Sequence, residues 1–227
     1  MSEAQGNHGY QAMTPVSRPG PLRHLVEETL RELIVSGALA PGQHLVELEV
    51  ADRLQVSRGP VREAFQALHS QGWVDLRPGR GAFVHAPTVE EVDELFGVRA
   101  ALEGEAAALA AKAMCAERLA ELEEISARGR AAVLGHEYDR VVATNSELHR
   151  RIADLAGNAL LCQMIASLDG RIRWYLRPVV HNRGIASWDE HDALIEALAD
   201  HDAERARQLM REHTGRTRQA NLTARLE

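Results

Sequence analysis

The chain has few cysteines, few aromatic residues and no long apolar run. Its two cysteines, Cys115 and Cys162, follow no pattern that would predict a disulfide framework or a zinc ribbon, and they fit a reducing compartment. No apolar segment approaches the roughly 20 residues that span a bilayer, and the first 20 residues lack the apolar core of a signal peptide. We therefore expect a cytoplasmic protein with no membrane partner.

Aromatic residues make up only 4% of the 227 residues, whereas hydrophobic residues make up 45%, and this balance favours helices. The length suits one or two domains. The net charge of −7 is uneven, because residues 1–86 carry 8 basic and 9 acidic side chains while residues 87–227 carry 18 and 24. A generally basic nucleic-acid binder is excluded, so any DNA contact must be a local patch, and the acidic remainder points to another task.

The segment 45–85 shows the order of elements of a winged helix-turn-helix. Leu48, Ala51 and Leu54 share one face at helical spacing and predict a first helix. Ser57 predicts the N-cap of a second helix. A pair of short strands around a glycine-rich tip, residues 77–81, predicts a hairpin wing.

Exposed arginines give this segment its expected function. The second helix directs Arg58 and Arg62 outward, and the wing tip carries Arg77 and Arg80. A helix with arginines in its N-terminal turns can enter a major groove about 12 Å wide, while the wing reaches the flanking backbone or the minor groove. An ordinary amphipathic helix with solvated arginines is the alternative, but the cap, the paired arginines and the basic wing together favour operator binding.

The rest of the chain predicts a tail, one more helix and a second domain. Residues 1–20 are polar with no periodicity, which predicts a disordered tail. Thr88 followed by Glu91 predicts a capping box at the border between a winged helix-turn-helix domain, 21–86, and a second domain, 87–227. No strand signal follows residue 86, so the fold class is mainly α and the second domain an all-α bundle of about six helices. The expected helices are 21–36 before the motif and 89–113, 116–134, 138–156, 159–176, 187–199 and 202–223 in the bundle, with a polar loop at 181–184.

Three of the 11 histidines lie on apolar stripes of different predicted helices, namely His149, His191 and His213. Asn145 lies four residues before His149 and shares its helix face. Donors from three helices would then converge inside one bundle, as a divalent metal requires. Hydrogen-bonded core histidines are the alternative, and spacing alone leaves both open.

The motif VSRGPVREAFQALHSQGWVDLRPGRGAFV resembles the DNA-binding domain of the GntR family of bacterial transcription regulators, over about residues 22–85. Three residues depart from the common family pattern: Leu48 replaces an arginine, Gln55 a glycine and Gly59 a threonine, so the operator sequence does not carry over. The resemblance and the exposed arginines together predict DNA contacts at Ser57, Arg58, Gly59, Arg62, Arg77, Gly79 and Arg80.

Residues 88–224 resemble the all-helical FCD effector domain of the FadR-type branch, with the VanR-like subgroup closest, through LFGVRAALEGEAAALAA, NSELHRRIADLAGN, DEHDALIEALADHD and REH. Many such domains hold one divalent metal on an Asp or Asn and three histidines. The resemblance therefore implies a Zn, Ni or Mn ion on Asn145, His149, His191 and His213. It also implies a homodimer on a pseudo-palindromic operator, with repression that an effector relieves.

An asparagine among the ligands has an electrostatic consequence. Three neutral imidazoles and a neutral amide leave a divalent cation its full charge, so we expect a small carboxylate effector. Arg99, Arg171 and Arg173 are candidates for a second contact with it, and ordinary salt bridges are the alternative for each. A metal-free effector pocket and a metal-dependent hydrolase are the other functions considered. The chain has no motif for a general base, and a DNA-binding domain argues against an enzyme.

Overall fold

The computed structural model describes residues 21–226, so the expected disordered tail, 1–20, lies outside the described residues. The described chain is mainly helical, as predicted, and divides into two compact units. One unit comprises residues up to 31 together with 44–83, and the other comprises 32–43 and the residues from 84 onward. Among the described residues, every helix is too short or too polar to cross a bilayer.

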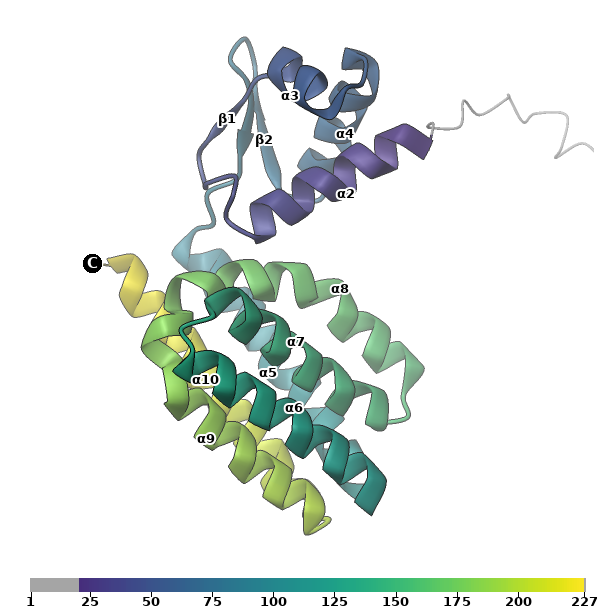
Figure 1. Ribbon diagram of the computed structural model, residues 1–227, viewed down its shortest axis with the longest axis vertical. Coiled ribbons are helices and arrows are strands. Elements are labelled where there is room, and N and C mark those ends of the chain that lie inside the picture. The colour runs from purple at the N-terminus through teal and green to yellow at the C-terminus, as the bar shows by residue number, and fades with distance from the viewer. Residues whose placement is uncertain (1–20, 227) are drawn as a thin grey trace, which may run out of the picture. The chain divides into compact units, whose positions relative to one another are not determined.

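Within the described residues, the N-terminal elements are three helices and a small sheet (Figure 1). The sheet has the strand order β1-β3-β2, and β1 was not predicted because two residues are too short to show an alternating pattern. In it His44 pairs with Phe83 and Leu45 with Ala82 in antiparallel register. The elements are α2 (Pro21–Val35), β1 (His44–Leu45), α3 (Glu47–Leu54), α4 (Arg58–Ser70), β2 (Val74–Arg77) and β3 (Gly81–Val84).

The turn between α3 and α4 sets the direction of the second helix. Gln55 has φ 54° and ψ 44°, a left-handed conformation that a glycine would adopt without strain. After this turn, α4 buries a stripe of four apolar side chains, Val61, Ala64, Phe65 and Leu68. Its opposite face, which carries the arginines, is left exposed.

The second unit contains six α-helices within its described residues, in agreement with the predicted bundle. The capping box at its start is confirmed, because Thr88 Oγ1 accepts from the Glu91 backbone N–H while the Glu91 carboxylate accepts from the Thr88 N–H. The helices are α5 (Val89–Lys112), α6 (Ala116–Leu134), α7 (Tyr138–Leu155), α8 (Ala159–Leu176), α9 (Val180–Ala199) and α10 (Ala203–Leu226), with a 3-10 turn η1 (Arg177–Val179) before α9.

The loop predicted at residues 181–184 is wrong, because α9 already begins at Val180. His181 and Asn182 are exposed, so the polar run is the solvent-facing side of a helical turn. Gly184 interrupts the helix with φ 39° and ψ −133°, values that favour glycine. The sequence therefore predicted the break in the helix correctly at Gly184 but wrongly included the helical residues before it.

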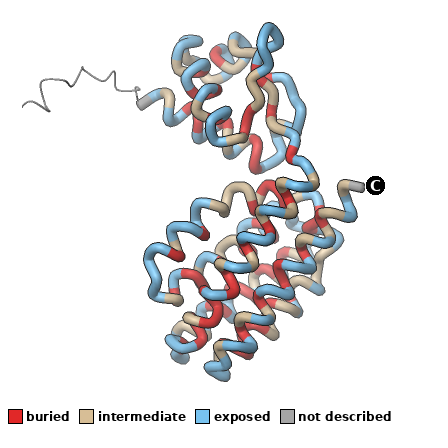
Figure 2. Tube along the Cα trace, turned by 180° about the vertical axis from the view of Figure 1, so that it is seen from behind, coloured by how far each residue is buried: buried red, intermediate tan, exposed pale blue. Residues whose placement is uncertain are grey.

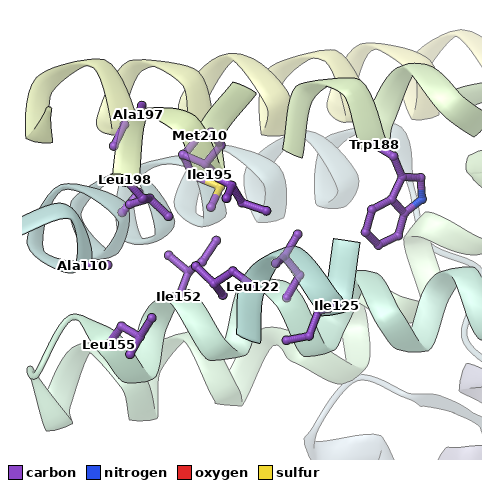
Figure 3. Packing of buried hydrophobic residues seen from close by; sticks show 14 of the residues in the cluster. Ala110, Leu122, Ile125, Ile152, Leu155, Trp188, Ile195, Ala197, Leu198 and Met210 are labelled. Carbon is purple, nitrogen blue, oxygen red and sulfur yellow. The ribbon is translucent and has the colours of Figure 1, made fainter. Parts of the chain in front are cut away.

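Buried and exposed stretches alternate along each helix of the bundle (Figure 2). Aliphatic side chains from several helices meet in its interior, among them Leu122, Ile152 and Met210 (Figure 3). Trp188 projects from α9 into the same core and is only 1% exposed. A Cβ on Gly129 of α6 would lie 1.9 Å from the Trp188 ring, so the glycine is what allows this close approach.

Candidate nucleic-acid interface and metal centre

Three of the seven residues predicted to contact DNA line one groove of the first unit. A cavity of about 500 Å³ lies between α4 and the wing, and its lining includes Arg62, Arg77 and Gly79. The Arg77 guanidinium stacks over the Phe83 ring at 4.3 Å, which holds it against β3 beside the wing tip. Arg80 lies on the exposed turn between β2 and β3.

The start of α4 is open to an incoming ligand. Ser57 is the N-cap residue with an extended backbone, but its side chain makes no capping hydrogen bond. A Cβ on Gly59 would meet nothing within 4 Å. Unsatisfied N–H groups at a helix N-terminus favour phosphate, so this end of α4 suits a DNA backbone.

Glu47, which the sequence argument did not single out, lies between the two arginines of α4. Its Oε1 accepts from Arg58 Nε at 3.0 Å and from Arg62 Nη2 at 3.0 Å, and its Oε2 accepts from Arg62 Nε at 3.3 Å. The hydrogen bond from Arg62 lowers the pKa of the Glu47 carboxyl below its ordinary value, and Arg58 adds to this shift. The carboxylate is therefore ionised at neutral pH.

In the second unit the three predicted histidines converge. Nε2 of His191 lies 3.3 Å from Nε2 of His149 and 3.2 Å from Nε2 of His213. All three residues are buried, with 4% or less of their surface exposed. Nitrogen atoms bound tetrahedrally to a zinc ion at about 2.0 Å lie about 3.3 Å apart, so the spacing suits a divalent ion.

Two carboxylates determine which nitrogen of each outer ring carries the proton. His149 Nδ1 lies 2.9 Å from Glu103 Oε2, and His213 Nδ1 lies 2.8 Å from Glu190 Oε2. A carboxylate can only accept, so we assign the proton to Nδ1 in both rings and a lone pair to Nε2. Arg99 Nη2 also lies 3.1 Å from His149 Nδ1, but a protonated nitrogen cannot accept, and Arg99 donates to Glu103 through Nε at 3.0 Å.

The electrostatics keep the histidines neutral. Burial lowers the pKa of His149, and burial with the neighbouring rings holds the pKa of His191 well below its usual value. Burial likewise lowers the pKa of His213 to about 4. Burial alone would raise the pKa of Glu103, but the charge of Arg99 and the hydrogen bonds from His149 and Arg99 lower it to about 2. In many metal sites, a neutral histidine binds the ion through one ring nitrogen and donates the N–H of the other to a carboxylate. The neutral imidazoles and ionised carboxylates here match that arrangement.

A cavity of about 340 Å³ opens beside His149, and its lining includes Arg99, Glu103 and Asn145. Asn145 is buried, one turn before His149 on α7. Arg99 is 1% exposed, and its Nη1 has no hydrogen-bond partner among the described residues. The remaining lining residues are Ser146, Arg150, Ala153, Asp154, Cys162, Gln163, Ile165, Ala166, Asp169 and Ile172, so neither Arg171 nor Arg173 faces this cavity.

Sequence reasoning missed the outer carboxylates as well as Glu47. Glu103 lies 46 residues from His149 and Glu190 lies 23 from His213, so local spacing does not connect them. A signal was available for Glu103, since it is a charged residue on the buried face of α5.

Comparisons with known proteins agree with both units. The family model of bacterial regulatory proteins of the gntR family matches residues 22–84, and the FCD domain model matches residues 94–216. The HTH-type transcriptional repressor RspR of Escherichia coli (strain K12) is 30% identical over 159 residues, which are 70% of each chain.

Solved structures of regulators share the fold. The structure of E. coli McbR/YncC covers 94% of this chain and 100% of its own, with a TM-score of 0.75 and 26% identity. A putative transcriptional regulator GntR from Rhodococcus sp. RHA1 covers 88% of this chain and 97% of its own, with a TM-score of 0.74 and 25% identity. The chain therefore belongs to the GntR family of bacterial regulatory proteins, as a DNA-binding transcription regulator with an FCD domain and not an enzyme.

Proposed function

We propose that the regulator binds one divalent metal ion and a carboxylate effector in its FCD domain. The observation that carries the proposal is that Nε2 of His149 and Nε2 of His213 both lie within hydrogen-bond distance of Nε2 of His191. Nε2 of His149 and of His213 are lone-pair acceptors, so a core without metal offers them a single shared proton, on His191. A divalent ion would satisfy all three nitrogen atoms, and the ligand set would be His149, His191, His213 and Asn145.

The effector is a monocarboxylate with an apolar body. A cation held by neutral ligands attracts an anion, and the unpartnered Arg99 Nη1 would donate to the same carboxylate. Asp154 and Asp169 also line the cavity, so a second carboxylate on the effector is disfavoured. The apolar body would contact the apolar part of the lining, which comprises Ala153, Cys162, Ile165, Ala166 and Ile172.

Thermal melting of metal-stripped protein tests the metal. Zn, Ni or Mn that binds the native state raises the melting midpoint by mass action. His191→Asn, whose amide cannot reach the Nε2 position, should abolish that rise, whereas His181→Asn, exposed on the same helix, should retain it. No rise with any of the three metals would contradict the metal and favour a metal-free effector pocket.

Calorimetry of the metal-loaded protein tests the effector class. Phenylacetate and hexanoate should bind, phenylacetamide should not, and succinate should bind more weakly than either monocarboxylate. Arg99→Lys keeps a charge beside Glu103 but lacks the guanidinium fork, so we expect roughly tenfold weaker carboxylate binding with metal binding intact. Equal affinity for the acid and its amide would contradict the proposal.

We also propose a cytoplasmic homodimer that represses transcription until the effector binds. RspR is described as a repressor, which favours this sign of regulation. Leu160 and Met164 lie one turn apart on α8 and are 67% and 46% exposed, an apolar surface that a second copy would cover. Light scattering should give twice the chain mass of 25.0 kDa, and a monomer would contradict the dimer. Effector added to the operator complex should lower DNA affinity.

A further inference from the structure

We propose that Glu47 is a specificity-determining residue that holds the recognition arginines for base reading. One carboxylate at the first position of α3 pairs with both Arg58 and Arg62, 11 and 15 residues away on α4. The side chains of Arg58 and Arg62 are 59% and 64% exposed, whereas that of Glu47 is 22% exposed. The acid thus lies behind the two arginines and leaves their outer surfaces to solvent.

The ion pairs with Glu47 leave most N–H groups of the two guanidiniums free to contact bases. Glu47 occupies Nε and one N–H of Nη2 on Arg62, and only Nε on Arg58. A guanidinium has five N–H groups, so Arg62 keeps both N–H groups of Nη1 and one of Nη2. Guanine is read by two such N–H groups on its O6 and N7 atoms. A carboxylate on the Nε side therefore holds the guanidinium in place and leaves free the N–H groups that read guanine. Less side-chain entropy is then lost when the arginine binds DNA.

Charge supports the same role. Arg58 and Arg62 are four residues apart on one helix, where like charges repel, and both lie near the positive N-terminus of α4. Without Glu47 the two side chains would spread apart toward any nearby phosphate. With Glu47 in place, the net positive charge at this end of α4 is reduced, so phosphates are attracted less strongly. The acid should therefore weaken sequence-independent binding while it strengthens discrimination between sequences.

The test compares Glu47→Gln with Glu49→Gln. Both substitutions remove one negative charge from the first turn of α3, but the described residues show no ion pair at the exposed Glu49. Two probes are used: a duplex selected from a random-sequence pool by the wild-type protein, and a duplex of the same composition with shuffled sequence. The measured quantity is the ratio of the two affinities at fixed salt.

Glu47→Gln should lower this ratio by roughly tenfold or more, the share of one well-oriented bidentate contact, through weaker binding of the selected duplex and stronger binding of the shuffled one. Glu49→Gln should leave the ratio within about twofold. Glu47→Asp keeps the charge but is one methylene shorter, so its ratio should also fall. An unchanged ratio in Glu47→Gln, or an equal fall in Glu49→Gln, would overturn the proposal.

A double-mutant cycle separates this role from general support of the fold. In Arg62→Lys, an ammonium replaces the fork and only the Arg58 pair remains, so adding Glu47→Gln should lower the affinity ratio less than it does in the wild type. If Glu47→Gln lowered the ratio as strongly in Arg62→Lys as in the wild type, Glu47 would not act through Arg62. Equal melting midpoints of Glu47→Gln and Glu49→Gln would show that unfolding does not produce the difference.

Discussion

Replacement of Gly129 by alanine would probe the contact between α6 and Trp188. The new Cβ would lie 1.9 Å from Cη2, 2.0 Å from Cζ2 and 2.4 Å from Cζ3 of the indole, whereas ordinary contacts begin near 3.4 Å. These atoms belong to a rigid ring that is 1% exposed, so they cannot swing into solvent. Trp188 also meets the His191 ring edge-on at 4.7 Å, so a displaced indole would disturb a proposed metal ligand.

Two opposing effects set the size of the change. Overpacking of a dense core costs about 1–3 kcal/mol, and relief of this contact needs a ring shift of more than an ångström, so the upper half of that range applies. Alanine in a helix interior is favoured over glycine by about 1 kcal/mol. The free energy of unfolding should therefore fall by about 1–2 kcal/mol. For a chain of this size, the melting midpoint should fall by about 2–8 °C.

Gly215→Ala is the matched control, since Gly215 lies inside α10, is exposed, and a Cβ there would meet nothing within 4 Å. Only the helix preference acts at that site, so its midpoint should rise by about 2–4 °C. Melting of both variants is followed by circular dichroism, and zinc titration should show weaker binding in Gly129→Ala alone. A midpoint for Gly129→Ala at or above that of the wild type would refute the packing argument.

Four further substitutions test the other elements. Arg62→Ala should weaken binding of a selected duplex by about 1–3 kcal/mol in a sequence-selective way. Arg80→Ala should weaken binding to all sequences equally and lower the salt dependence of binding. Unchanged affinity in both variants would contradict the assignment of α4 and the wing as the DNA-contacting elements. Glu190→Gln should weaken metal binding by about 10- to 100-fold in calorimetry, and equal weakening in Glu212→Gln, which pairs with the same Arg216, would argue against an outer-ligand role. Thr88→Ala should lower the free energy of unfolding by about 1 kcal/mol in urea, and no change would mean that the capping box contributes nothing.

Most of the fold was predictable because it rests on local patterns. The sequence predicts 116–134 and 159–176 with the bounds that α6 and α8 have, since a glycine ends one and an asparagine caps the other. Strand β1 was not predictable, because its two residues are a strand only through their pairing with β3. The polar run at 181–184 misled because exposed polar residues are common both in loops and on the outer faces of helices.

In the candidate site, too, the residues that show a local pattern were predictable and those that depend on contacts between helices were not. The three histidines were predictable because each interrupts an apolar stripe of its own helix, and their convergence follows from packing those stripes inward. Glu190 and Glu103 were not found, since their relation to the rings depends on contacts between different helices. The assignment of Glu47 to the arginines has the same origin, since it joins α3 to α4.

The three candidate arginines differ in whether they lie on the buried face of their helix. The inward face of α5 runs through Val92, Phe96, Arg99, Glu103 and Ala106, all of them buried. A basic and an acidic residue at i and i+4 on such a face are tolerated only as a satisfied pair, because an unpaired buried charge is costly. Among the described residues Arg99 Nη1 has no hydrogen-bond partner, and Arg99 lines a cavity, so an anionic ligand there would complete the pair. Arg171 and Arg173 lie off the buried stripe of α8, so the structure favours Arg99 among the three candidates that the sequence left open.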